Sequence, residues 1–344
     1  MTQTILLGTY TKKDSKGIYS IQLDTQKKSL DLLKEEAHIG NPTYLDGTDD
    51  LSLLFSVAKT EDKGGIASFR KGELGNYLAM DTFMEEGAPP CYVAYDSDRE
   101  LVYTANYHTG EVAVFSTNSE GELTLVDKVK HSGSSVHDNQ KGPHAHYFDL
   151  TPDKDFLVAC DLGTDEVITY SLTMDHKLQP VASVKMPAGT GPRHIVFHPQ
   201  KPYAYVMGEL SSEVVVLSYD KDEGRFDSIQ TITSIPEDHT GFNGAAAIRM
   251  SSDGKFLYAS NRGHDSLVVY AIKENGTLEL VEYVPTEGKT PRDFNLDPSE
   301  QFIVVAHQDT DNLTLFERNK ADGTLTMLQK DVYAPEVICV TFKK

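Results

Sequence analysis

Residues with acid–base or anion-binding side chains recur at matching places along this sequence. His146, Arg193 and Arg292 each follow the Ala or Pro that opens an alternating apolar segment. Glu209 and Arg262 each stand just past a continuous apolar run. Imidazole and carboxylate groups can activate water, and arginines bind phosphates, carboxylates and developing oxyanions. Brought together, these residues would form a hydrolytic site for an anionic substrate.

The elements that carry these residues belong to one repeated unit. Each copy has an opening Pro or Ala, an alternating apolar segment, a turn, a continuous apolar run that ends in a polar pair, and a hairpin. The copies begin at Pro42, Pro90, Ala145, Pro192, Ala245 and Pro291. A period of about 50 residues with four strands is typical of a β-propeller blade, because solenoid repeats are shorter. One polar insertion, residues 131–141, predicts a surface loop.

The two ends of the chain supply one further blade. Residues 335–340 repeat the opening strand, and the sequence then ends. Residues 4–8, 17–23 and 30–37 match the three strands that this copy lacks. The sequence therefore predicts an all-β, seven-bladed β-propeller with four-stranded antiparallel blades, forming a single domain over residues 1–344. Pairing of the C-terminal strand with the N-terminal strands would close the ring and remove its exposed sheet edges.

The predicted fold places the polar residues at one mouth of a central channel. In a four-stranded blade, the start of the first strand and the end of the second lie on the same face near the channel. Side chains at these places differ between blades while the apolar frame stays constant, which indicates function. We predict four catalytic groups: His146, Glu209, Arg193 and Arg262. The predicted substrate-binding groups are Arg292, His144, His194, Asp161, Asn261 and His307.

Each of these positions also has a structural interpretation. Arginines at blade tops often hold loops by donating to carbonyl groups, and Glu209 could form a salt bridge with one of them. His144 and His146 have the alternate spacing of a metal-binding pair, but no third ligand is indicated, so we predict no metal and no cofactor. For His194, His198 and His307 the structural interpretation is the favoured one.

Composition and charge restrict the possible partners. The chain has 32 Lys and Arg against 52 Asp and Glu, a formal net charge of −20, which disfavours nucleic acid and anionic membranes as partners. The start of the sequence lacks a basic segment, and no apolar run reaches the ~20 residues of a membrane span, so a cytoplasmic protein is expected. Cys91, Cys160 and Cys339 are predicted to be buried free thiols.

Five motifs give the sequence a resemblance to a known family. It resembles the seven-bladed propeller 6-phosphogluconolactonases, a lactonase family that also includes the fungal cis,cis-muconate lactonising enzymes. The matching motifs are Gly142-Pro143-His144-Ala145-His146, Gly191-Pro192-Arg193-His194-Ile195-Val196-Phe197-His198-Pro199, Gly208-Glu209, Ser260-Asn261-Arg262-Gly263-His264-Asp265-Ser266 and Thr290-Pro291-Arg292-Asp293-Phe294. They extend from the third blade to the sixth.

The resemblance implies an activity and a set of active-site groups. It implies hydrolysis of 6-phospho-D-glucono-1,5-lactone to 6-phosphogluconate in the pentose phosphate pathway, without a redox cofactor. The related muconate enzymes use a His, two Arg and a Glu, which match His146, Arg193, Arg262 and Glu209 here. This chain departs from the family at Ala247, where an acidic residue is common, so any auxiliary role of that group is not expected here.

Three functional hypotheses remain open at this point. In the first, Glu209 or His146 activates water, one arginine stabilises the oxyanion, and the others bind the phosphate of a small phosphorylated sugar lactone. In the second, the same site takes another lactone or a carboxylate substrate, because arginine binds both anions. In the third, the propeller is a non-catalytic platform that binds proteins. A closed ring protects its own edges, so a monomer is expected.

Overall fold

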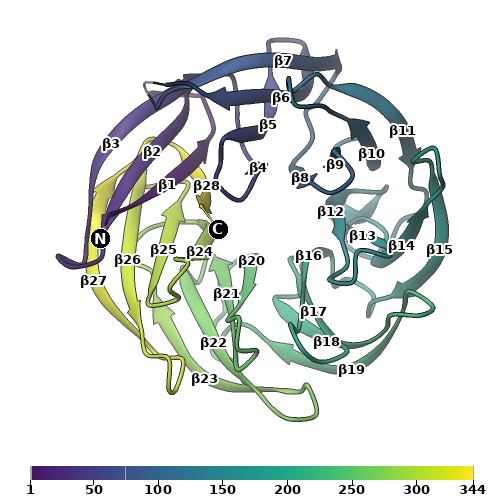
Figure 1. Cartoon of the computed structure of the whole chain (residues 1–344). Helices are drawn as coiled ribbons and strands as arrows, with labels where there is room; N and C mark the ends of the chain where they lie inside the picture. The colour runs from purple at the N-terminus through teal and green to yellow at the C-terminus, as the bar shows by residue number, and fades with distance from the viewer. Residues whose placement is uncertain (1, 74, 344) are drawn as a thin grey trace.

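The computed structural model describes residues 2–73 and 75–343, and they form a ring of seven four-stranded antiparallel sheets. In Figure 1 the first strand of each blade lies next to the central channel and the fourth strand lies at the periphery. The seven-bladed, all-β prediction is confirmed. No helix among the described residues is long and apolar enough to cross a membrane.

Six blades are continuous in the chain. The first three are β4 (Leu45–Gly47), β5 (Leu53–Lys59), β6 (Lys63–Lys71) and β7 (Tyr77–Glu86); β8 (Tyr92–Asp96), β9 (Leu101–Asn106), β10 (Glu111–Ser116) and β11 (Thr124–Lys130); and β12 (Ala145–Leu150), β13 (Leu157–Asp161), β14 (Glu166–Leu172) and β15 (Leu178–Lys185). The next three are β16 (Pro192–Phe197), β17 (Tyr203–Gly208), β18 (Glu213–Asp220) and β19 (Arg225–Thr233); β20 (Gly244–Met250), β21 (Phe256–Arg262), β22 (Ser266–Ile272) and β23 (Leu278–Pro285); and β24 (Pro291–Leu296), β25 (Phe302–His307), β26 (Asn312–Arg318) and β27 (Leu325–Tyr333).

The remaining blade joins the two ends of the chain. It consists of β28 (Val337–Phe342), β1 (Thr2–Thr9), β2 (Gly17–Asp24) and β3 (Ser29–His38). Strand β28 pairs with β1 from Ile5↔Phe342 to Thr9↔Val337, so the C-terminal strand occupies the innermost position of the blade. The predicted closure of the ring is confirmed.

The position of each strand in the ring explains its sequence pattern. The second and third strands pack against neighbouring blades on both faces, so they carry continuous buried runs such as residues 204–207 and 303–306. The fourth strand has one face in solvent, so exposed and partly buried residues alternate along β15 and β19. The apolar clusters therefore lie between adjacent blades, and each blade contributes to the burial of its neighbours.

β-Bulges near the start of three first strands direct the predicted site residues. Ala145 pairs with Asp161 and Tyr147 with Cys160, so His146 is an extra residue without a ladder partner. Arg193 and Arg292 stand at the same interruption in β16 and β24. A bulge re-aims the side chain of the extra residue. In these three blades the opening of the repeat thus provides one polar position that is free of the sheet pattern.

The insertion at residues 131–141 is mostly exposed, as predicted, but it is anchored near both ends. His131 and Gln140 are buried, and a short 3-10 helix, η1 (Asp138–Gln140), ends at the second of them. The Gln140 amide donates to the Leu162 carbonyl at 2.8 Å, which fixes the loop to the third blade. Strand β11 begins only at Thr124, because a turn precedes it, in which the Gly121 amide donates to the Asn118 carbonyl and the Glu122 amide donates to the Asn118 side chain.

Removal of β28 should prevent stable folding. A chain that ends at Glu336 loses the buried side chains of Val337, Val340 and Phe342 and exposes the inner edge of β1. Each such side chain contributes about 1.5–3 kcal/mol, and the sum approaches the whole stability of an ordinary domain. We expect aggregation or loss of the cooperative thermal transition, measured by circular dichroism and size-exclusion chromatography. A chain that ends at Phe342 is the matched control, and equal melting temperatures for the two would contradict this account.

Candidate active site

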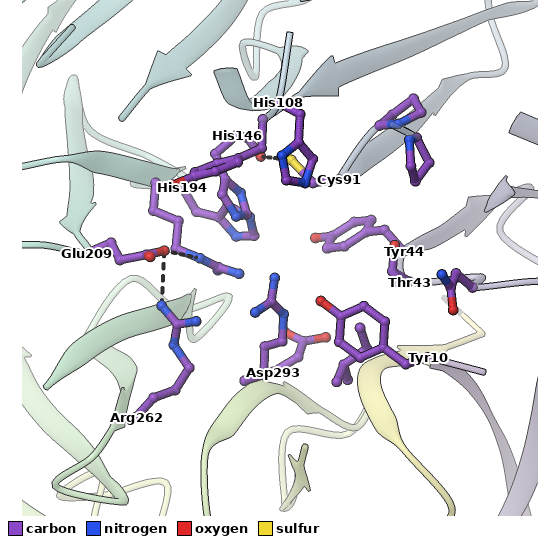
Figure 2. Close-up of a pocket in the computed structure, with 17 residues that line it drawn as sticks. Tyr10, Thr43, Tyr44, Cys91, His108, His146, His194, Glu209, Arg262 and Asp293 are labelled. Atoms are coloured by element: carbon purple, nitrogen blue, oxygen red, sulfur yellow. Dashed lines mark hydrogen bonds and ion pairs between the residues drawn. The ribbon is translucent and has the colours of Figure 1, made fainter. Parts of the chain in front are cut away.

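A pocket of about 280 Å³ opens at the channel mouth where the first strands begin (Figure 2). Six of the predicted site residues line it, namely His146, Arg193, His194, Glu209, Arg262 and Arg292. They come from five different strands or strand ends, spread over four blades. The propeller therefore brings the predicted catalytic set into one cavity.

A backbone hydrogen bond joins the segment that carries Arg193 to the segment that carries Glu209. Gly191 has a φ of 62°, and a Cβ there would lie 2.6 Å from the Leu210 side chain, so only glycine fits. The Gly191 carbonyl accepts the Glu209 amide at 2.8 Å. This bond joins the start of β16 to the end of β17, and it sets Arg193 beside Glu209.

Carboxylates at equivalent places fix the start of the next blade. Asp165 accepts the amide of Gly191 at 2.7 Å, Asp265 accepts that of Thr290 at 2.9 Å, and Asp311 accepts that of Glu336 at 2.9 Å. All three aspartates have positive φ values, between 52° and 56°. These aspartates position the start of the neighbouring blade. The sequence analysis gave them no role, although their recurrence after the second strands of three blades is visible in the repeat.

Glu209 is the shared ionic partner of two arginines (Figure 2). Its Oε2 lies 3.0 Å from Nε of Arg193 and 3.0 Å from Nη2 of Arg262. Burial by itself raises the pKa of Glu209, but the charges of the three pocket arginines outweigh burial and lower the pKa below its ordinary value. Glu209 is therefore a stable anion that orients cations.

The three arginines are held to different degrees. Arg262 also donates to the carbonyls of Gly244 and Ala245, at 2.9 and 3.1 Å, so the loop-holding interpretation is correct for part of this side chain. Arg193 is buried, and its Nη1 has no hydrogen-bond partner among the described residues. Burial and the neighbouring arginines lower the pKa of Arg193, which nevertheless stays protonated at neutral pH. Arg292 has one long contact, from Nη1 to Oε1 of Gln308 at 3.5 Å, so it is the cation most free to bind a ligand.

His146 is a buried imidazole in this cationic environment. Burial, with the charges of Arg193 and Arg292, lowers the pKa of His146 well below its ordinary value, so the ring is neutral at pH 7. Its Nδ1 is enclosed and has no partner among residues 2–73 and 75–343. The imidazole can therefore act on a ligand only through its other ring nitrogen.

An aromatic and ionic layer forms the floor of the pocket. His194 packs against the rings of Tyr44 and Tyr92, with centroids at 6.0 and 5.6 Å. Asp293, also in the lining, accepts from Arg249 at 2.9 Å. Burial raises the pKa of Asp293, and the Arg249 charge opposes that effect. His194 was among the predicted substrate-binding groups, whereas Tyr44 and Asp293 were not identified from the sequence; Asp293 could have been found from its place directly after Arg292.

Four predicted substrate-binding residues do not line this pocket. Asp161 is fully buried and accepts from His131 and from the amides of residues 144, 163 and 164. Asn261 donates to the Ser234 carbonyl, and the His307 Nδ1 lies 3.1 Å from the Asn312 carbonyl oxygen. These three side chains form hydrogen bonds with nearby backbone groups and thereby stabilise tight turns. His144 stacks on Tyr107, a lining residue, with centroids 4.3 Å apart.

Further groups were considered as metal ligands or nucleophiles. The described residues contain no group of three or more His, Cys, Asp or Glu side chains arranged to hold a metal ion. All three cysteines are free; Cys160 and Cys339 are buried as predicted, whereas Cys91 is partly buried and lines the pocket. Burial raises the pKa of Cys91 to about 11, which leaves its thiol protonated at neutral pH.

Comparison with known proteins identifies the family. Residues 4–342 match the family described as "Lactonase, 7-bladed beta-propeller". The chain belongs to this lactonase family. It is 43% identical over 339 residues to the 6-phosphogluconolactonase of Bacillus subtilis, covering 98% of this chain and 97% of that one.

Solved structures share both the fold and much of the sequence of this lactonase. A Lactobacillus plantarum protein is 47% identical with a TM-score of 0.97, and the match covers 99% of both chains. The periplasmic gluconolactonase PpgL of Pseudomonas aeruginosa is 32% identical with a TM-score of 0.93, again over 99% of both chains. The lactonase is thus similar to enzymes named for a phosphorylated and for an unphosphorylated lactone.

The buried histidines predict how stability depends on pH. Burial lowers the pKa of His146 and His194 well below the ordinary value and that of His307 to about 4. As the pH falls below ~6.5, the unfolded chain binds protons that the folded protein does not, so the folded state loses stability. The free energy of unfolding should fall by up to about 1.4 kcal/mol per pH unit for each histidine.

Urea unfolding at pH 7, 6 and 5 measures this effect. The His307→Gln variant should show a smaller pH dependence than the wild type, because one of the three buried histidines is gone. The His38→Gln variant is the control, since that side chain is exposed. Identical pH dependence in all three proteins would contradict the assignment.

Proposed function

We propose that this lactonase hydrolyses 6-phospho-D-glucono-1,5-lactone to 6-phosphogluconate, in the pentose phosphate pathway of the cytoplasm. The observation that carries the proposal is the single pocket in which a neutral imidazole faces three arginines. In a protein with a net charge of −20, such a cationic cavity favours an anionic ligand. The similarity to the Bacillus subtilis 6-phosphogluconolactonase supports the choice of substrate.

The proposed reaction needs no group beyond this chain and water. His146 takes a proton from water as the water oxygen bonds to the lactone carbonyl carbon. Arg193, with its unpartnered Nη1, stabilises the negative charge that develops on the carbonyl oxygen. The bond between that carbon and the ring oxygen then breaks, and His146 returns its proton to the ring oxygen, which becomes a hydroxyl group.

His146 is the better candidate for the base, and Glu209 has a positioning role. Glu209 is held by Arg193 and Arg262, and its lowered pKa makes it a poor proton acceptor. The pKa of His146 is lowered in part by arginine charges, which an anionic substrate would offset. Binding of the substrate therefore makes His146 a stronger base when it is needed.

A second candidate function is hydrolysis of an unphosphorylated sugar lactone. The similarity to the Pseudomonas aeruginosa gluconolactonase favours this alternative, which would use the same reacting groups. The two functions differ in whether an anion far from the reacting ester is recognised. A non-catalytic platform that binds proteins at the same face of the propeller would hydrolyse neither lactone.

Direct assay of lactone hydrolysis tests the proposal. Freshly generated 6-phosphogluconolactone and gluconolactone should be compared above their spontaneous rates, with and without a chelator. We expect acceleration that is strong for the phosphorylated lactone and insensitive to the chelator, because arginines supply the positive charge. Equal acceleration of both lactones would favour the second candidate, and no acceleration of either would refute hydrolysis of these lactones.

Substitution of the two acid–base candidates separates their roles. His146→Ala should lower kcat by about 100- to 10,000-fold, the usual effect of losing a general base. Glu209→Gln should retain more turnover and keep the acidic limb of the pH–rate profile, because His146 remains. His38→Ala, at an exposed site, serves as the control. The opposite order of the two effects would assign the base to Glu209.

A further inference from the structure

A second cationic region lies at the outer edge of the pocket, around the ring of Tyr10. Tyr10 belongs to the pocket lining, and Figure 2 shows its ring across the cavity from Glu209 and Arg262. The Lys12 ammonium lies 4.0 Å from the centre of this ring, and the Arg292 guanidinium lies 6.0 Å from it. Two positive charges from different blades therefore meet at one aromatic side chain.

The segment that carries Tyr10 and Lys12 is held by a buried carboxylate. Glu336 is 3% exposed, and its two oxygens accept the amides of Lys12 and Lys13, each at 2.8 Å, and that of Ser15 at 3.2 Å. The Tyr10 amide donates to the Glu336 carbonyl at 3.0 Å. The β1–β2 connection is thus fixed to the closure of the ring, and its backbone is ordered before any ligand arrives.

Lys12 differs from the lysine beside it. The Lys13 ammonium forms an ion pair with Asp311 at 3.4 Å. No described carboxylate forms an ion pair with Lys12, although acidic residues outnumber basic ones by 52 to 32 along the chain. Lys12 is exposed and lies against the ring of Tyr10. Because no described acidic side chain pairs with it, its charge is available to a ligand.

Arg292 is the second cation near the Tyr10 ring. Among the described residues its side chain makes one long hydrogen bond, of 3.5 Å to Gln308, so its guanidinium can also turn towards a ligand. Lys12, Arg292 and the Tyr10 hydroxyl group can each donate a hydrogen bond near the mouth of the pocket. A phosphate group has several oxygens that can accept such hydrogen bonds. The reacting groups His146 and Arg193 lie deeper, in the buried part of the same cavity.

We propose that Lys12, Tyr10 and Arg292 form a subsite that binds the phosphate of the substrate, with Lys12 as the residue that determines specificity for a phosphorylated lactone. This inference rests on the proposed function. The lactone ring then lies between the subsite and the Glu209–Arg193–Arg262 cluster, and the phosphate remains at the mouth of the pocket. Glu336 acts as a positioning residue for the subsite.

Kinetics with two substrates test the role of Lys12. Lys12→Gln should lower kcat/KM for 6-phosphogluconolactone about tenfold or more, the usual effect of losing one hydrogen bond to a charged group. The same variant should leave kcat/KM for gluconolactone unchanged, and Lys12→Arg should restore most of the loss. Lys13→Gln is the matched control, because it alters an exposed lysine in the same segment and should affect neither substrate.

Direct binding separates failure of this inference from failure of the proposed function. Calorimetry on the full-length protein with 6-phosphogluconate and with gluconate does not depend on turnover. We expect the wild type to bind the phosphorylated acid more tightly, and Lys12→Gln to remove about tenfold of that preference. If the wild type hydrolyses neither lactone, the proposed function fails, and the binding comparison still decides the subsite. Equal effects of Lys12→Gln on both ligands, or no effect on either, would overturn the subsite.

Discussion

The ionic contact of Glu209 with two arginines is the interaction on which the site depends. Arg193 and Arg262 come from adjacent blades and are largely buried, so their charges need a compensating anion. Glu209 supplies that anion from the end of β17, and the backbone bond from its amide to Gly191 fixes where it stands. The carboxylate therefore permits two cations to remain at the centre of a closely packed ring.

The same cluster sets the electrostatics of the whole pocket. Burial and, after it, the charges of the fixed arginines lower the pKa of His146, and the arginines create a positive cavity within an acidic protein. Because the positive charges belong to fixed side chains, they need little reorganisation when negative charge develops on a substrate. The His146 imidazole is neutral before a ligand binds. The negative charge of a bound anion would raise its pKa and make it a stronger base.

The ring geometry explains how such a cluster can exist. First strands converge on the channel, and a bulge in three of them turns one side chain away from the sheet pattern. Aspartates after the second strands of three blades accept backbone amides at the starts of the next blades, so the position of each start is fixed by the blade before it. The closing blade adds Glu336, which links the ends of the chain to the segment around Tyr10.

The sequence alone determined the number of blades, the closure of the ring and the convergence of His146, Arg193, Glu209, Arg262 and Arg292. These features follow from a repeat of apolar runs, because burial between blades imposes the same pattern on every copy. Only the tertiary structure decided which polar residues face the pocket. Asp161, Asn261 and His307 occupy repeat positions equivalent to one another, but their short side chains or ring nitrogens are engaged by nearby backbone groups. Tyr10 and Tyr44 join the site through contacts between segments distant in sequence, which no local pattern records.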